Sequence, residues 1–350
     1  WILGQTRSAI SAIISQPLGA GKLNALKNFP AQAIAYNVAL SLVILAGTYF
    51  FVKPIFQLLH AQGIVLEFSI SYYNIRVWGF PLTLFTFAVF GIFRGLQNTF
   101  WPMLVALTGT LINILLDFLL VYGWKSIPAL GIQGAAWASL FAQFVMAVFA
   151  LILLVKRTPV RLRLKRAMHP QLPRLVAMSL NLFVRSVALN LALLLAVRQA
   201  TALGNVYIAA HAIAINIWLF SAFFLDGYGA AGNILGGKIL GANNLNLLWK
   251  LTKRVLFYNL VVALVLVALG LIFYKPLGLL FNKDPQVLTA FYGLFFMVLI
   301  SQPLNAVAFT LDAILTRNKF TFCNHVFIIL LFMISHSIRK MVWLGFLVKV

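Results

Sequence analysis

The chain has 350 residues, of which 63% are apolar and only 9% are charged, with 27 Lys and Arg against 5 Asp and Glu. A soluble domain is about 45–50% apolar and about 25% charged, so this composition excludes an ordinary soluble enzyme, a disordered chain and a secreted disulfide scaffold. It predicts an all-α polytopic membrane protein. The net charge of +22 does not indicate a nucleic-acid partner, because the cations lie in short loops between apolar stretches.

Apolar stretches of membrane-spanning length recur along the whole chain. Strands of a transmembrane barrel have about 10 residues of alternating polarity, and these stretches are longer and more uniformly apolar. They are therefore expected to be helices, since about 20 residues cross a bilayer as a helix. The stretches cover 1–20, 31–57, 66–93, 100–123, 129–155, 174–197, 206–235, 255–274 and 287–313, followed by a tenth from about 320 to the end.

The basic residues alternate between the two ends of these stretches. Loops on one side hold 16 Lys and Arg and loops on the other side hold five, so the richer side is predicted to be cytoplasmic. Residues 156–173 form the one long polar segment and contain Pro159 and Pro170. This segment is predicted to link an N-lobe (1–155) to a C-lobe (174–315). It sets topology or binds anionic lipid.

The chain contains an internal repeat with a shift of 222 residues. Residues 18–93 align with 240–315 without a gap, and 21 of the 76 positions are identical, against roughly 6 expected by chance. The matched positions include Asn37 with Asn259 and Pro81 with Pro303. Six spans separate equivalent points, so the two copies share one orientation. A repeat of this kind is typical of secondary transporters with a cavity between two lobes. The paired prolines are predicted to kink equivalent helices.

The period also predicts more chain than is present. Two complete copies would hold about twelve helices, so the first helix and the normal C-terminal helices are expected to be missing here. The register fails after residue 315, where Cys323-Asn324 stands in place of a second Trp-Pro pair. We expect residues 316–350 to be an atypical apolar tail.

The repeated Leu-Gly-Ala turns at Leu18 and Leu240 resemble the multidrug and toxic compound extrusion (MATE) family, as does the run from Arg94 to Pro102. The stretch 209–242 resembles the subfamily of DNA-damage-inducible protein F. This resemblance implies two six-helix lobes, with 1–155 holding the family's helices 2–6 and 174–315 its helices 7–10. It also implies a multi-pass antiporter in the bacterial inner membrane that exports lipophilic, often cationic compounds in exchange for H⁺ or Na⁺.

Asn113 and Asp117 are the first candidate site residues. They lie four residues apart and therefore on one face of a helix. An ionised acid at the bilayer centre costs at least about 2.5–3.5 kcal/mol, so such acids face cavities or partners. The resemblance implies that the matching Asn and Asp lie in the N-lobe cavity with an Asp of the first helix, which is expected to be missing here. The alternative is a structural, hydrogen-bonded acid near a helix end.

Three further charged residues are candidates in the C-lobe. Asp226 is expected to be a cavity acid and Arg185 its partner, although a structural ion pair inside the lobe remains equally open. Asp312 lies near a cytoplasmic end, where a structural role competes with a role in the cavity. Both acids precede small residues, which also allows close helix packing there.

Other classes of function lack support in the sequence. There is no Walker loop, no nucleophile–base arrangement and no His, Cys, Asp or Glu spacing typical of a metal site. We expect no cofactor besides the coupling ion, no catalytic residues, a lipid bilayer and drug-like molecules as partners, and a monomer. Two alternatives stay open: a lipid-linked oligosaccharide flippase of the same superfamily, or a non-transporting remnant.

Overall fold

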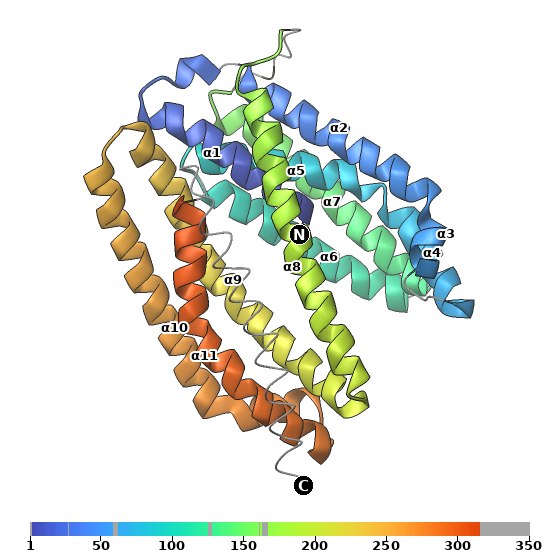
Figure 1. Ribbon diagram of the computed structural model, residues 1–350. Helices are drawn as coiled ribbons and strands as arrows, with labels where there is room; N and C mark the ends of the chain where they lie inside the picture. Colours follow the sequence, from blue (N-terminus) through green and yellow to red (C-terminus); the bar gives the residue numbers. More distant parts are fainter. Residues whose placement is uncertain are drawn as a thin grey trace. The chain divides into compact units, whose positions relative to one another are not determined.

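The computed structural model describes residues 2–26, 28–58, 62–124, 128–160, 162 and 167–315. These residues form helices joined by short loops (Figure 1). Two are short 3₁₀ helices, η1 (Ile2–Gln5) and η2 (Leu23–Leu26). The others are α1 (Thr6–Gly19), α2 (Phe29–Phe50), α3 (Val52–Leu58), α4 (Gly63–Arg76), α5 (Gly79–Gly95), α6 (Phe100–Tyr122), α7 (Gly131–Arg157), α8 (Leu172–Ala202), α9 (Asn205–Gly241), α10 (Leu245–Phe281) and α11 (Pro285–Leu315).

The helices have the length and apolarity that a bilayer requires. Among the described residues, 7 helices are long and apolar enough to cross a membrane, or up to 8 if the bent pair α4 and α5 counts as one span. The predicted all-α, multi-pass architecture is thereby confirmed. The predicted tenth stretch and the tail 316–350 lie outside the described residues.

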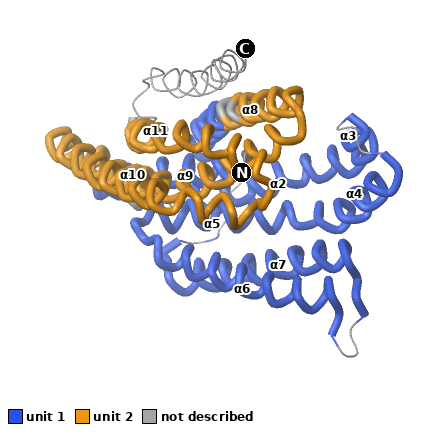
Figure 2. Tube along the Cα trace, turned by 90° about the horizontal axis from the view of Figure 1, so that it is seen from below, with its two compact units in different colours: residues 1–182 blue, residues 183–350 orange. Residues whose placement is uncertain are grey.

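The chain divides into two compact units, residues 1–182 and 183–350, coloured separately in Figure 2. The boundary lies within α8, so the first unit includes the polar linker and the first turns of that helix. The second unit holds the rest of α8 and α9, α10 and α11.

A continuous apolar core joins the helices of the first unit. It contains Ile10 and Ile14 of α1, Phe29 of α2, Ile92 of α5 and Leu175 of α8. Two glycines of α5, Gly91 and Gly95, allow α1 to approach closely, as in the small-xxx-small contacts of membrane helices. In the second unit, two smaller apolar clusters lie between α9, α10 and α11.

The internal repeat is visible in the backbone at the ends of α1 and α9. Ala20 after α1 has φ −80° and ψ 1°, and its counterpart Ala242 after α9 has φ −78° and ψ 1°. The next residues, Gly21 and Asn243, both take the left-handed conformation, with φ of 68° and 55°. Such a left-handed residue ends many helices because it lets backbone N–H groups reach the last free carbonyls. The two copies therefore fold alike where their sequences match.

The copies differ in how their helices break. In the first unit the chain breaks at Phe51, between α2 and α3, and bends by 50° between α4 and α5 at Val77 and Trp78. The matching α10 and α11 in the second unit are single helices, and α11 continues through Pro303. Pro81 lies in the first turn of α5, where a missing N–H costs little, so the bend precedes it. Paired prolines thus do not produce equivalent bends.

Candidate functional site

Asn113 and Asp117 share one face of α6, one turn apart, as expected. The Nδ2 of Asn113 donates a hydrogen bond to Ser139 Oγ of α7 at 3.5 Å. Asp117 is half-buried, and its Oδ1 is buried with no hydrogen-bond partner among the described residues. A buried carboxylate oxygen without a donor is energetically costly, and acids within membrane helices face partners or cavities, so Asp117 remains a candidate site residue.

The start of α6 is fixed by the turn after α5. Gln97 takes a left-handed conformation with φ 66°. The side chain of Asn98 accepts hydrogen bonds from the backbone N–H groups of Phe100 and Trp101, at 3.2 and 3.4 Å. Asn98, which precedes the N-cap residue Thr99, therefore satisfies two free N–H groups of the first turn of α6, and Pro102 follows within that turn, where proline is tolerated. The turn that carries the family resemblance also fixes the helix bearing Asp117.

Polar contacts between α4 and α7 accompany the bend after α4. Arg76 donates from Nη1 to Gln143 Oε1 at 2.8 Å, and Gln133 donates from Nε2 to Ser71 Oγ at 2.7 Å. A Cβ on Gly79 would meet the side-chain ends of both Arg76 and Gln143, so a larger residue there would have to displace this hydrogen bond. Beside these contacts lies an open groove of about 570 Å³, lined by Phe68, Ser71, Ala129, Leu130, Gly131, Ile132 and Gln133.

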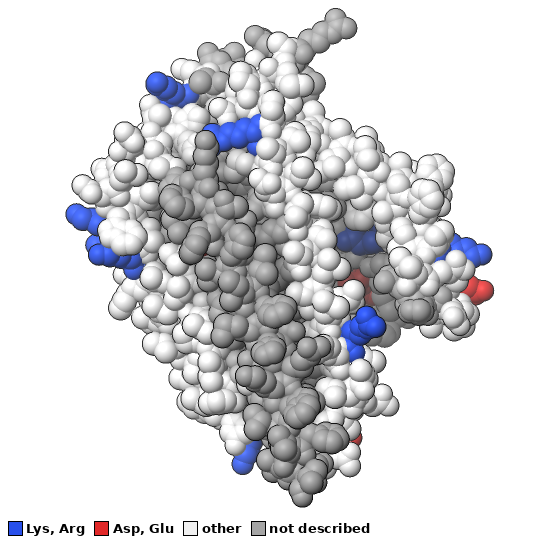
Figure 3. Space-filling view, in the orientation of Figure 1, with Lys and Arg blue, Asp and Glu red and all other residues white. Residues whose placement is uncertain are grey.

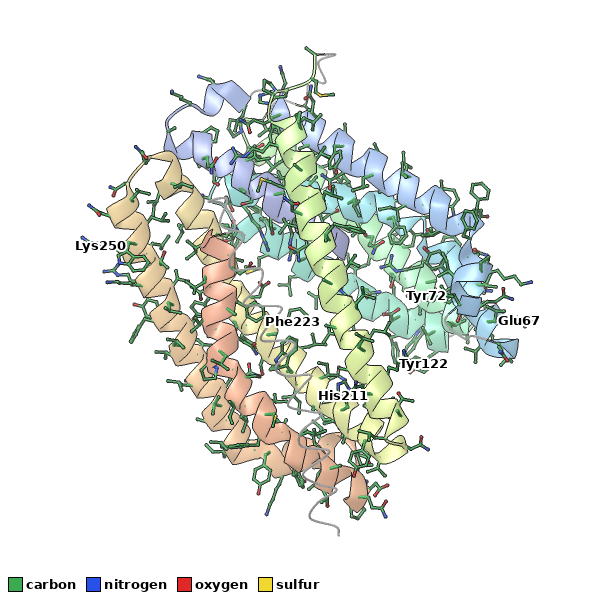
Figure 4. All side chains as sticks on the ribbon, in the orientation of Figure 1. Glu67, Tyr72, Tyr122, His211, Phe223 and Lys250 are labelled. Carbon is green, nitrogen blue, oxygen red and sulfur yellow. The ribbon has the colours of Figure 1, made fainter. Side chains whose placement is uncertain are left out.

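The predicted C-lobe residues lie on three different helices. Asp226 of α9 is exposed, whereas Asp312 of α11 is buried. Arg185 belongs to α8, but its side chain lies outside the described residues. The predicted pairing of Arg185 with Asp226 therefore stays a prediction. His211, labelled on α9 in Figure 4, is also buried, and Glu67 of α4 is exposed.

The sequence analysis did not identify a buried polar junction in the second unit. Asn259 of α10 is fully buried, and its Nδ2 lies 3.2 Å from the Leu225 carbonyl oxygen of α9. It also lies 3.1 Å from the Ala306 carbonyl oxygen and 2.9 Å from Thr310 Oγ1, both on α11. One amide thus joins three helices. The identity of Asn37 and Asn259 in the repeat was the signal that could have found it.

We expect Asn259→Ala to lower the free energy of unfolding by about 2 kcal/mol, since interhelical hydrogen bonds in membranes contribute about 0.6 kcal/mol each and up to about 1.7. Asn37→Ala is the matched control. Asn37 is equally buried, but its Nδ2 bonds only the Ala33 carbonyl of its own helix. Asn37→Ala should cost about a third as much, since one hydrogen bond is lost instead of three. Unfolding of the purified chain in detergent, followed by circular dichroism, measures both. Equal losses would contradict the bridging role.

No group of three or more His, Cys, Asp or Glu that could hold a metal occurs within the described part of the chain. The candidate site is the Asn113–Asp117 face of α6, where Asn113 bonds Ser139 of α7 and Asp117 Oδ1 is buried.

The chain is similar in sequence to known proteins of one family. The family model MatE matches residues 2–119 and 182–337. Protein DETOXIFICATION 43 of Arabidopsis thaliana is 32% identical over 244 residues, covering 70% of this chain and 45% of the relative. DNA damage-inducible protein F of Escherichia coli is 29% identical over 249 residues, covering 68% of this chain and 52% of the relative. The chain thus spans about half the length of the curated relatives it matches.

Solved structures share the fold. A MATE crystal structure in complex with MaD5 superposes with a TM-score of 0.85 at 19% identity, covering 94% of this chain and 74% of that chain. An outward-facing multidrug resistance MATE transporter of the MOP superfamily gives a TM-score of 0.80 at 18% identity, covering 95% and 81%. At these identities the comparison concerns architecture alone.

Proposed function

The chain belongs to the MatE family, and on that premise we propose that it is a secondary active transporter that exports lipophilic, often cationic, organic compounds in exchange for H⁺ or Na⁺. Members of this family are transporters and not enzymes. Among its relatives, MdtK of Photorhabdus laumondii, 26% identical over 80% of this chain, is named a multidrug resistance protein. The proposed location is the bacterial inner membrane, which the chain crosses several times.

The observation that carries the proposal is the environment of Asp117. This carboxyl is half-buried in a membrane helix, and one of its oxygens is buried and lacks a donor in the described residues, so we propose it as the group that binds the coupling ion. Asn113 adds a neutral polar group one turn away on the same face. Binding on one side of the membrane and release on the other would couple the ion gradient to movement of the cargo.

Asp226, Arg185 and Asp312 are proposed as further cavity residues in the second unit. The cargo would be small, drug-like molecules, and the transporter would act as a monomer. The intramembrane acids favour cationic cargo over the pyrophosphate of a lipid-linked oligosaccharide.

The coupling ion can be identified by dye efflux. Cells that lack their own efflux pumps and express the chain should extrude ethidium. Collapse of the gradient of the coupling ion should stop this extrusion, and collapse of the other gradient should not. A protonophore tests the proton gradient, and replacement of external Na⁺ by choline tests the Na⁺ gradient. Efflux that persists with both gradients collapsed would contradict secondary transport. Rescue of a flippase-deficient strain without any ethidium efflux would favour the oligosaccharide flippase instead.

A further inference from the structure

Helix α10 is longer than a bilayer core is thick. Its 37 residues span about 55 Å at 1.5 Å per residue, whereas the hydrocarbon core is about 30 Å thick. Residues 255–274 carry no charge, and they lie between Arg254 and Lys275. These two cations are about 32 Å apart along the helix, close to the thickness of the core. The ten residues Leu245–Arg254 therefore project into the headgroup region.

The projecting segment presents a cluster of cations and aromatic side chains. Lys250, Lys253 and Arg254 are exposed, and Lys253 and Arg254 follow Lys250 by three and four residues, so both lie beside it on one face of the helix. Trp249 is 61% exposed, and Lys253 Nζ lies 5.5 Å from its ring centroid. Figure 3 shows basic side chains at the place where Figure 4 labels Lys250, on an otherwise mostly uncharged face. No acid forms an ion pair with the three cations within the described ranges.

The corresponding face of α2, in the first copy of the repeat, is covered by another segment of the chain. Gln32 of α2, the counterpart of Arg254, is 7% exposed. Its side chain donates to the Ala167 carbonyl oxygen and accepts from the His169 N–H, both at 2.8 Å. The linker before α8 thus packs on this face in the first unit. In the second unit the matching face is cationic, and its residues Arg254 and Tyr258 are both exposed.

We propose that Lys250, Lys253 and Arg254 bind the phosphate of an anionic phospholipid headgroup, with Trp249 at the membrane interface. Three cations on one face suit a phosphate diester, and Lys and Arg near an anionic membrane surface attract it. A lipid is favoured over a soluble phosphate because Phe257, one turn further into the membrane, is 62% exposed and can contact an acyl chain. Trp at this level is typical of membrane anchors. This inference goes beyond the proposed transport and does not depend on it.

The test is lipid binding to the purified full chain in detergent. Native mass spectrometry with added phosphatidylglycerol should show bound lipid, and phosphatidylcholine should bind far more weakly. The variant Lys250→Gln/Lys253→Gln/Arg254→Gln should weaken phosphatidylglycerol binding by roughly 100-fold, from about fivefold per cation. A Lys250→Arg/Lys253→Arg variant retains the charges and should bind normally.

The control variant removes the same charge elsewhere. Lys53→Gln/Arg198→Gln/Lys283→Gln changes three exposed cations outside the cluster, and it should bind phosphatidylglycerol like the parent chain. An equal loss in the control would overturn the site in favour of a general charge effect. Unchanged binding in the cluster variant would also overturn it. Competition by inorganic phosphate as strong as by the lipid would assign the cluster to a soluble anion instead.

Discussion

Replacement of Asp117 by Asn is expected to reduce ethidium efflux by roughly 100-fold, to the background of cells without the chain. The charged carboxyl costs about 3 kcal/mol within the bilayer, and this free energy is available to drive ion binding and release. An amide is similar in size but cannot take up a proton or balance a cation. The variant should therefore reach the membrane and fail to couple. Initial rates of efflux from preloaded cells, normalised to the amount of chain in the membrane, measure the effect.

Asp284→Asn is the matched control for this prediction. Asp284 is exposed at the start of α11, where its Oδ1 accepts a hydrogen bond from the Gln286 N–H at 2.8 Å. Asn caps helices about as well as Asp, so the structure should be preserved. Efflux by this variant should equal that of the parent chain. Normal efflux by the Asp117 variant would remove this residue from the coupling site, whereas loss in both variants would indicate a general effect on insertion.

The spanning helices and the internal repeat could both be predicted from the sequence alone. Only helices and closed β-barrels satisfy backbone hydrogen bonds within a bilayer, and these apolar stretches are too long and too uniform for barrel strands, so they predict spanning helices. The repeat also predicted local geometry: the Leu-Gly-Ala turns before Gly21 and Asn243 end their helices with nearly the same backbone angles. Where the two copies of the repeat share the same residues, interactions between neighbours in the sequence determine the backbone conformation.

The differences between the copies could not be predicted from the repeat. Pro81 and Pro303 occupy matching positions, yet only the first copy has a bend nearby. The bend coincides with the contact between Arg76 and Gln143, and the second copy has Val298 in place of Arg76. Such a contact joins helices that are distant in the sequence, so it has no local signal. The Asn259 junction likewise depends on partners from two other helices.

The exposed position of Asp226 also depends on contacts between helices that are distant in the sequence. Its residue type and its place in an apolar stretch predicted a cavity acid. Whether the face of α9 that carries Asp226 is buried or exposed depends on how α10 and α11 pack against that helix. Helix periodicity could place Asn113 and Asp117 together, since both lie on one helix. It could not bring Asp226, Arg185 and Asp312 to a common point.

Gly91→Val is expected to lower the free energy of unfolding by about 3 kcal/mol, the upper part of the range for overpacked cores. A Cβ on Gly91 would lie 2.7 Å from the Arg7 carbonyl oxygen and 2.9 Å from Ile10 Cβ, both on α1. Backbone cannot move aside as a flexible side chain can, so α1 and α5 must separate. That separation also opens the apolar core, to which Ile10 and the neighbouring Ile92 belong. Thermal unfolding in detergent micelles measures the change.

The control separates packing from the intrinsic effect of valine in a helix. Gly47 of α2 is exposed, and a Cβ there would have nothing within 4 Å, so Gly47→Val should change the free energy of unfolding by less than about 0.5 kcal/mol. Equal losses at both glycines would refute close α1–α5 packing as the cause. Because Gly91 lies away from Asp117 in the sequence and on another helix, efflux per folded molecule should stay unchanged in Gly91→Val. Stability and coupling would then depend on separate helix contacts of the first unit: α1 with α5 for stability, and α6 with α7 for coupling.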